Sequence, residues 1–207
     1  MELFFIFTGA FAVALSGALI PGPMLTVTVF HSLKTGFRAG PLVTLGHAAA
    51  ELTLLALIIL GLGGILARPA VMRVVFTAGG LLLIVTAAFM LKASNNLSLE
   101  IKSPGDSSAG GPFLSGLITS VSNPTWTLWW VTIGITYLTK ALEHGPAGIA
   151  AFFSGHILAD FGWYGFISLA VSRGKSRISP GAYRKFISVC GAALGCFGAW
   201  FLLQGVL

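Results

Sequence analysis

The chain has 207 residues, of which 56% are apolar and only 9% are charged, and its net charge is +6. Soluble domains carry about 25% charged residues, so this composition excludes a protein whose whole surface faces water. A bilayer core about 30 Å thick is crossed by about 20 residues of helix, and the chain contains apolar runs of that length. We therefore expect an all-α integral membrane protein.

Apolar stretches follow one another along the chain and predict six transmembrane helices. They lie at about 3–30, 40–65, 71–92, 113–138, 147–171 and 184–206. Residues 93–112 form a long polar stretch, rich in Ser, Asn, Gly and Pro, that falls midway. We expect a single transmembrane domain over 1–207, with a first three-helix repeat at about 1–92, a linker at 93–112 and a second repeat at about 113–207.

The basic residues are divided unevenly between the two sides that six helices would create. One side would carry Lys34, Arg38, Lys92, Lys102, Arg173, Lys175, Arg177, Arg184 and Lys185, and the other Arg68, Arg73 and Lys140. Loops rich in Lys and Arg stay in the cytoplasm, so we expect a multi-pass protein of the cytoplasmic membrane with both termini outside. No basic patch interleaved with aromatic residues indicates nucleic-acid binding, and the expected surroundings are the lipid bilayer.

Prolines interrupt the first and the fourth apolar stretch. Pro21, Gly22 and Pro23 interrupt the first, and Asn123 and Pro124 the fourth. Missing amide donors free backbone carbonyls, which a membrane tolerates only against protein or a water-filled cavity. Each helix restart presents free N–H groups and the positive end of the helix dipole, which attract carboxylates. One proline alone predicts a kink, but breaks at corresponding places in two halves point to a substrate site.

Two acidic residues lie inside apolar stretches, and each follows a histidine by four positions. Glu51 follows His47, and Asp160 follows His156. An ionised carboxylate inside a membrane is costly and is usually functional, so we predict that Glu51 and Asp160 bind substrate and the coupling proton. Each histidine shares a helix face with its acid and is a candidate proton relay. The alternative is that these groups are protonated or hydrogen-bonded for packing only.

The two Gly-His-x-x-x-acid blocks, Gly46 to Glu51 and Gly155 to Asp160, predict an internal repeat. A repeat of three helices forces the two halves into opposite orientations, with both breaks and both acids near a common site at the bilayer midplane. Alternating access would come from rocking one half against the other. Trp126, Trp129 and Trp130 follow the second break and are candidates for the pocket wall, with anchoring at the lipid interface as the alternative.

These motifs resemble the lysine exporter (LysE/RhtB) family of amino-acid exporters over nearly the whole chain. The resemblance is carried by Ala18-Leu19-Ile20-Pro21-Gly22-Pro23, Gly36-Phe37-Arg38-Ala39-Gly40, Leu45-Gly46 with Glu51, Phe113 to Gly116, Ser122-Asn123-Pro124, and Asp160 with Trp163-Tyr164. It implies a six-helix secondary transporter that exports amino acids, driven by the proton gradient. It also implies that the site falls on Pro21, Gly22, Pro23, Glu51, Asn123, Pro124 and Asp160.

The chain departs from the family pattern in ways that bear on the substrate. Thr125 stands where many members carry a basic residue, and His47 and His156 stand where many carry an aliphatic one. Two His and two acids form an N2O2 ligand set suited to Zn, Mn, Ni or Co. The leading hypothesis is therefore a proton-coupled exporter of a zwitterionic or cationic amino acid. The alternative is a divalent metal-ion exporter that uses His47, Glu51, His156 and Asp160.

Enzyme motifs are absent from the sequence. It contains no His-Glu-x-x-His, no Gly-x-Ser-x-Gly and no cofactor fingerprint, so we expect neither an enzyme nor a cofactor. A scaffold that only binds partner proteins would not need two buried acids. The sequence leaves open whether the transporter forms a homodimer.

Overall fold

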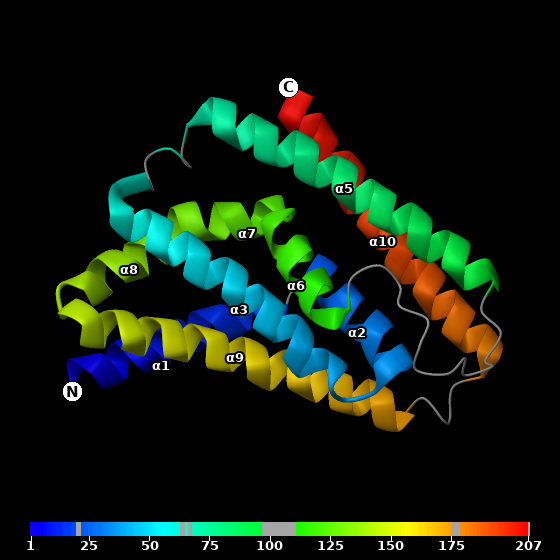
Figure 1. Cartoon of the computed structure of the whole chain (residues 1–207), viewed down its shortest axis with the longest axis horizontal. Coiled ribbons are helices and arrows are strands. Elements are labelled where there is room, and N and C mark those ends of the chain that lie inside the picture. The colour runs from blue at the N-terminus through cyan, green and yellow to red at the C-terminus, as the bar shows by residue number, and fades with distance from the viewer. Residues whose placement is uncertain (20–21, 63–64, 66–67, 97–110, 175–178, 207) are drawn as a thin grey trace.

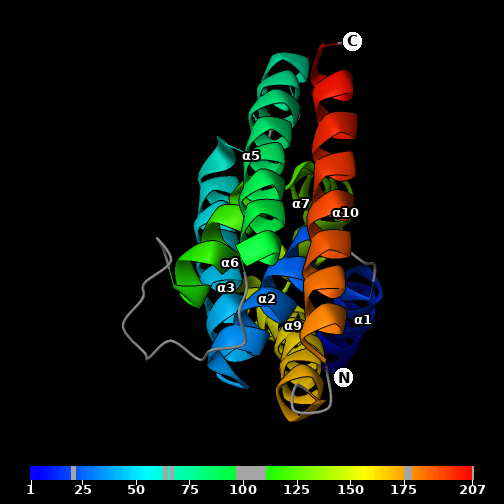
Figure 2. The same ribbon diagram turned by 90° about the vertical axis from the view of Figure 1, so that its right-hand side faces the viewer.

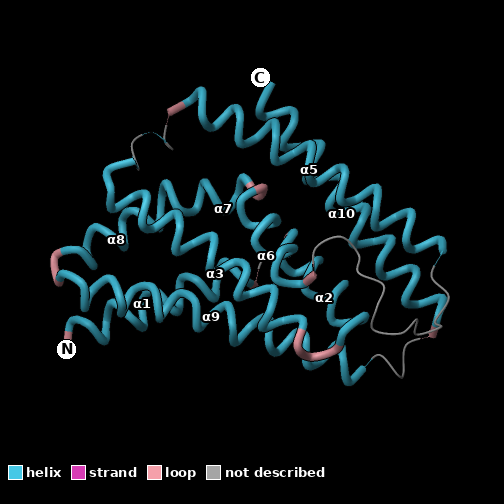
Figure 3. Tube along the Cα trace, in the orientation of Figure 1, coloured by secondary structure: helices cyan, strands magenta, loops and turns pink. Residues whose placement is uncertain are grey.

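The computed structural model describes residues 1–19, 22–62, 65, 68–96, 111–174 and 179–206. These residues form helices joined by short turns, with no strand among them (Figure 3). The structure thus confirms the all-helical fold class that the apolar stretches predict.

The helices follow the chain order shown in Figure 1. They are α1 (Glu2–Ala18), α2 (Pro23–Thr35), α3 (Ala39–Leu57), the π-helical turn η1 (Ile58–Leu62), α5 (Pro69–Asn96), α6 (Pro112–Val121), α7 (Pro124–Trp129), the π-helical turn η2 (Trp130–Gly134), α8 (Ile135–Leu142), α9 (Gly145–Gly174) and α10 (Pro180–Val206). Each predicted apolar stretch is helical over its described residues, except at Leu19 and Gly22 in the first and at Ser122 and Asn123 in the fourth. Most of the predicted linker, residues 97–110, lies outside the described part of the chain.

Length and hydropathy single out one described helix that could cross a membrane by itself. It runs over Ala39–Gly61, with 23 residues and a mean hydropathy of 1.9. Helices α1 and α2 reach the required length and hydropathy only together, with a bend of 75° between them. The number of membrane crossings, six from the sequence, therefore stays a prediction.

Helices end and begin again close to the prolines that the sequence singles out. Helix α1 ends at Ala18 and α2 begins at Pro23, preceded by an extended Gly22. Helix α6 ends at Val121 and α7 begins at Pro124. A proline suits the first position of a helix because its missing N–H would have no partner there. Pro21 lies outside the described residues.

The two helix starts differ in how they are capped. The side chain of Asn123 accepts a hydrogen bond from the Thr125 backbone N–H at 3.2 Å, so α7 has the asparagine cap that its sequence predicts. Helix α2 has no side-chain cap, because its N-cap residue is Gly22. The first backbone N–H groups of α2 are therefore left for another acceptor.

Long-range packing joins α1 to α9, α3 to α6, and α5 to α10. Figures 1 and 2 both show α5 and α10 side by side along their lengths. A Cβ atom added to Gly80 of α5 would lie 2.7 Å from the Gly198 carbonyl oxygen of α10, so these two backbones touch. Such close approach between small residues is typical of helix pairs in membranes, where dispersion contacts replace the hydrophobic effect.

Candidate functional site

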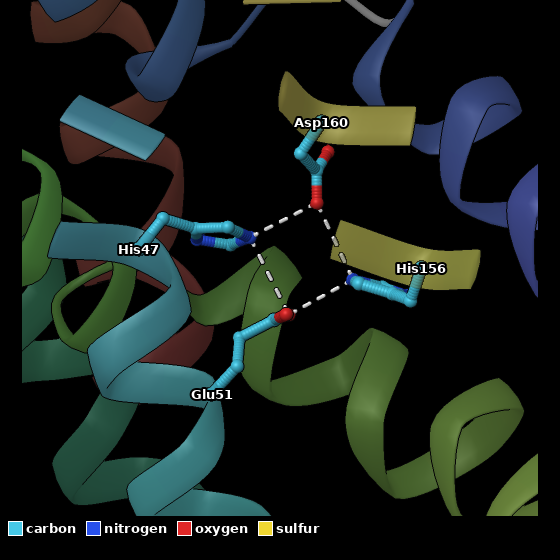
Figure 4. A group of neighbouring side chains, drawn as sticks. All are labelled: His47, Glu51, His156 and Asp160. Carbon is cyan, nitrogen blue, oxygen red and sulfur yellow. Dashed lines mark ion pairs between the residues drawn. The ribbon is translucent and has the colours of Figure 1, made fainter. Parts of the chain in front are cut away.

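Four ionisable side chains meet between α3 and α9. His47 and Glu51 lie one turn apart on α3, and His156 and Asp160 lie one turn apart on α9. Figure 4 shows the four side chains pointing toward one another. All are buried, with exposed fractions of 7% for His47, 1% for Glu51 and 5% each for His156 and Asp160. We refer to these four residues as the His–acid cluster.

The cluster is a closed cycle in which bases and acids alternate. The Glu51 Oε1 atom lies 3.0 Å from His156 Nε2 and 3.4 Å from His47 Nε2. The Asp160 Oδ2 atom lies 3.4 Å from His47 Nε2 and 3.5 Å from His156 Nε2. A nitrogen lone pair facing a carboxylate oxygen would repel it, so each of these contacts requires a proton or another cation. The arrangement can therefore hold positive charge inside an apolar protein.

A serine orients one of the two imidazoles. His47 Nδ1 lies 2.7 Å from the hydroxyl oxygen of Ser120, and that hydroxyl also lies 2.7 Å from the Gly116 carbonyl oxygen. A serine hydroxyl has one proton, and the carbonyl can only accept it. The hydroxyl therefore accepts from His47 Nδ1–H, which leaves His47 Nε2 to exchange its proton with the two carboxylates.

The two acids of the cluster have different surroundings. Glu51 Oε1 also accepts hydrogen bonds from the indole N–H groups of Trp126 and Trp130, at 3.2 and 3.1 Å. Asp160 Oδ2 has only its two long contacts with the histidines and no hydrogen bond among the described residues, and His156 Nδ1 and Glu51 Oε2 likewise have no hydrogen-bond partner there. Glu51 is thus held in place by two tryptophans, whereas Asp160 keeps the capacity to bind a ligand.

The cluster forms one wall of a cavity of about 270 Å³. Of the site residues predicted from the sequence, the cavity is lined by Gly22, Pro23, His47, Glu51, Asn123, His156 and Asp160. The structure thus brings both predicted breaks and both His–acid pairs to one place. Pro124 begins α7 beside this cavity, next to Asn123, and Pro21 lies outside the described residues.

Several residues at the cavity were not identified from the sequence. Tyr164 lines it one turn beyond Asp160, and the spacing His156, Asp160, Tyr164 along one helix face is a signal that could have found it. Ser120 carried a weaker signal, as a hydroxyl one turn before the second break. Phe197 and Phe201 of α10 also line the cavity, and nothing in the apolar sequence of that helix distinguishes them from its other apolar residues.

Two curated proteins are similar to nearly the whole chain. One, named "Putative amino acid efflux protein YcgF", from Bacillus subtilis (strain 168), is 26% identical over 209 residues that cover 97% of each chain. The other, named "Uncharacterized membrane protein YahN", from Escherichia coli (strain K12), is 29% identical over 189 residues, or 90% of this chain and 84% of that protein. No solved structure matches the chain.

A family model agrees with the resemblance drawn from the sequence motifs. The model described as LysE type translocator matches residues 15–205, which include both helix breaks and the whole His–acid cluster. The chain therefore belongs to the LysE type translocator family and is a membrane transport protein.

Proposed function

We propose that this protein exports amino acids across the cytoplasmic membrane by proton antiport with alternating access. The observation that carries the proposal is the buried His–acid cluster, which opens on a cavity beside both helix starts. The name of the Bacillus subtilis relative, an amino acid efflux protein, supports an amino acid as the cargo. The uneven distribution of Lys and Arg supports six crossings with both termini outside the cytoplasm.

Matching positions in the two halves support an inverted repeat. Gly46 and Gly155, and likewise Glu51 and Asp160, lie 109 positions apart. Gly36 in the turn before α3 and Gly145 at the first position of α9 are also 109 positions apart, and both have positive φ angles, of 78° and 59°. Only glycine adopts such angles without strain. A glycine with positive φ thus recurs at the same interval.

The contacts between helices also correspond in the two proposed repeats. A Cβ atom on Gly46 of α3 would collide with the backbone carbonyl of Phe113 in α6, and one on Gly155 of α9 would collide with that of Phe7 in α1. Each second helix of a half therefore packs against the start of the broken helix in the other half. A pseudo-two-fold axis in the membrane plane, between repeats at about 1–92 and 113–207, accounts for this exchange.

Charge balance within the cluster suggests how proton and substrate are coupled. Two protonated histidines balance the two carboxylates, so the filled cluster needs no further cation. When the ammonium group of an amino acid enters beside Glu51 and Asp160, release of one proton restores the balance. The cluster then holds either two protons or one proton and a substrate ammonium, and the two cargoes exchange at one place. Rocking of the halves, which separates α3 from α9, would expose the cavity to either side in turn.

Flux through purified protein in proteoliposomes tests this proposal. We expect uptake of radiolabelled amino acids to follow an imposed pH gradient. We expect the Glu51→Gln and Asp160→Asn variants to lose this gradient-driven uptake. Glu143→Gln is the matched control, because Glu143 is an exposed acid in the turn before α9. Amino-acid flux that ignores the gradient in the wild type would rule out antiport, and unchanged flux in both cluster variants would rule out the site.

The geometry of the cluster also admits a metal ion. One ligand atom from each of its four residues lies within 4.8 Å of the others. The comparisons favour amino-acid efflux over metal export, so metal export is the second candidate. If purified protein binds no Zn²⁺ or Mn²⁺ at stoichiometric level, and a His47→Ala His156→Ala variant still exchanges the wild-type cargo, the metal candidate fails.

A further inference from the structure

We infer that the substrate is a zwitterionic amino acid with an apolar side chain, of the size of Leu, Met or Phe, and not a cationic one such as Lys. This inference rests on the proposed function, because it names the kind of amino acid that the same cavity selects. It is carried by the distribution of polar and apolar groups around the cavity.

The charged groups of the cavity gather at one place. Its acidic lining residues are Glu51 and Asp160, both within the His–acid cluster, and none of its described lining residues is Lys or Arg. One ammonium group can therefore be neutralised at the cluster. A lysine side chain would carry a second ammonium several bonds away, where the described wall offers no carboxylate, and burying an unpaired charge is strongly unfavourable. An acidic side chain would likewise lack a cationic partner.

Much of the remaining lining is aromatic and aliphatic, and we call this part the apolar wall. It is formed by Trp126, Trp129, Phe197, Phe201, Met24 and Leu25. The indole N–H of Trp126 is engaged by Glu51 at 3.2 Å, so the surface that Trp126 offers a ligand is carbon. An aromatic ring can attract a cation, but the ring of Trp129 already packs against the imidazole of His156, with 4.7 Å between centroids. The wall thus suits a side chain that loses water at little cost.

Two features fix the orientation of the bound amino acid. The uncapped start of α2, a helix of 13 residues, lines the cavity with Gly22 and Met24 and has backbone N–H groups for the substrate carboxylate. Asp160 is 5% exposed, and its Oδ2 makes only long contacts, of 3.4 and 3.5 Å, with the two histidines and no hydrogen bond among the described residues, so it is the acceptor for the ammonium. The start of α7 is a poorer carboxylate site because Asn123 already caps it. With both ends of the zwitterion held, the side chain points toward the apolar wall.

The size of the cavity agrees with a single amino acid. Its volume of about 270 Å³ lies just below the range of about 300–1,000 Å³ that is usual for small-molecule sites. The cavity therefore suits one amino acid of moderate size, and it has little room for a longer peptide.

Counterflow into proteoliposomes tests the inference with a panel of leucine, methionine, phenylalanine, alanine, lysine and glutamate. We expect exchange of the first three, weaker exchange of alanine, and none of lysine or glutamate. Exchange of lysine but not of leucine would overturn the inference while the proposed function stands. Exchange of no amino acid at all would overturn the proposed function itself.

Variants of α10 test the apolar wall separately. Phe197→Ala shortens a half-buried residue of the apolar wall. We expect the ratio of KM for leucine to KM for alanine to rise about tenfold. A hydrophobic pocket discriminates between substrates by about that factor or more for each apolar group lost. Leu203→Ala is the control, because Leu203 lies on the same helix, is 61% exposed and does not line the cavity. An unchanged ratio in Phe197→Ala, or in Phe197→Leu if the alanine variant does not fold, would contradict the assignment.

Discussion

At the scale of single residues, the cluster depends on neighbours that hold its members in fixed orientations. Ser120 determines which nitrogen of His47 faces the acids, and Trp126 and Trp130 fix Glu51 through their indole N–H groups. Hydrogen bonds to charged groups contribute about 1.5–3 kcal/mol each, more than those between neutral groups. The two halves of the cluster are therefore not equivalent, and Asp160 is the member left to change partners.

Replacing Ser120 by alanine tests the orientation of His47. The change leaves His47 Nδ1–H without its acceptor in a buried place, and a loss of about 1.4 kcal/mol corresponds to a tenfold change in rate. We expect about tenfold slower exchange at saturating substrate, with little change in KM. Ser154→Ala is the control, since Ser154 donates only within its own helix, to the Ala151 carbonyl at 3.2 Å. Equal rates in the two variants would show that Ser120 has no part in proton exchange.

At the scale of helices, glycines set the distances at which the site is assembled. Gly46 and Gly155 each immediately precede a histidine of the cluster, and each lies against the backbone of a helix from the other proposed repeat. Because a helix cannot shift along its neighbour without moving these contacts, they fix α3 against α6 and α9 against α1. The tight packing and the alignment of the His–acid cluster are thus parts of the same arrangement.

Alanine at either glycine tests this role. An added Cβ would meet the backbone carbonyl of Phe113 or Phe7, and overpacking of this kind costs about 1–3 kcal/mol. We expect Gly46→Ala and Gly155→Ala to lower the thermal unfolding temperature in detergent and to slow transport.

The matched control for those variants is Gly162→Ala on α9. Nothing lies within 4 Å of a Cβ atom at Gly162, and alanine favours helix over glycine by about 1 kcal/mol. We expect Gly162→Ala to be as stable as the wild type or more so. If all three variants unfold at the same temperature, close backbone contact is not what holds α3 and α9 in place.

At the scale of the whole molecule, alternating access requires contacts between the halves to open and close. An ion pair of 3.1 Å joins Glu2 at the start of α1 to His144 in the turn before α9, and so connects the two proposed repeats at one end. Both side chains are partly or largely exposed, at 75% and 31%. The pair is therefore a place where the halves can be tethered without entering the cavity.

A reversible cross-link at this place tests the rocking motion. The variant Glu2→Cys His144→Cys is made in a Cys190→Ala Cys196→Ala background and treated with a short bifunctional thiol reagent that contains a disulfide. We expect the cross-linked protein to lose counterflow. Reduction of the cross-linker should restore counterflow. The single-cysteine variants, treated in the same way, control for modification alone. Full activity in the cross-linked protein would mean that this end of the molecule does not open during transport.

Much of the fold could be predicted from hydropathy and proline positions. The six apolar stretches are helical over their described residues except at the two breaks, after which α2 and α7 begin at Pro23 and Pro124. The π-helical turn over Trp130–Gly134 was not predicted, because local propensity does not distinguish it from α-helix. The contribution of Phe197 and Phe201 to the cavity was also missed, since an apolar helix in a membrane has no polar face to orient it.

The sequence by itself determined that His47 shares a helix face with Glu51, and His156 with Asp160, because residues four apart lie one turn apart on any α-helix. Only the tertiary structure decided that the two pairs interleave, so that each histidine lies within 3.5 Å of both acids. Helical periodicity is local, whereas the register between α3 and α9 depends on contacts such as that of Gly40 in α3, where an added Cβ would lie 2.5 Å from the Tyr164 carbonyl oxygen of α9. That register, set by contacts far apart in the sequence, makes one site out of two pairs.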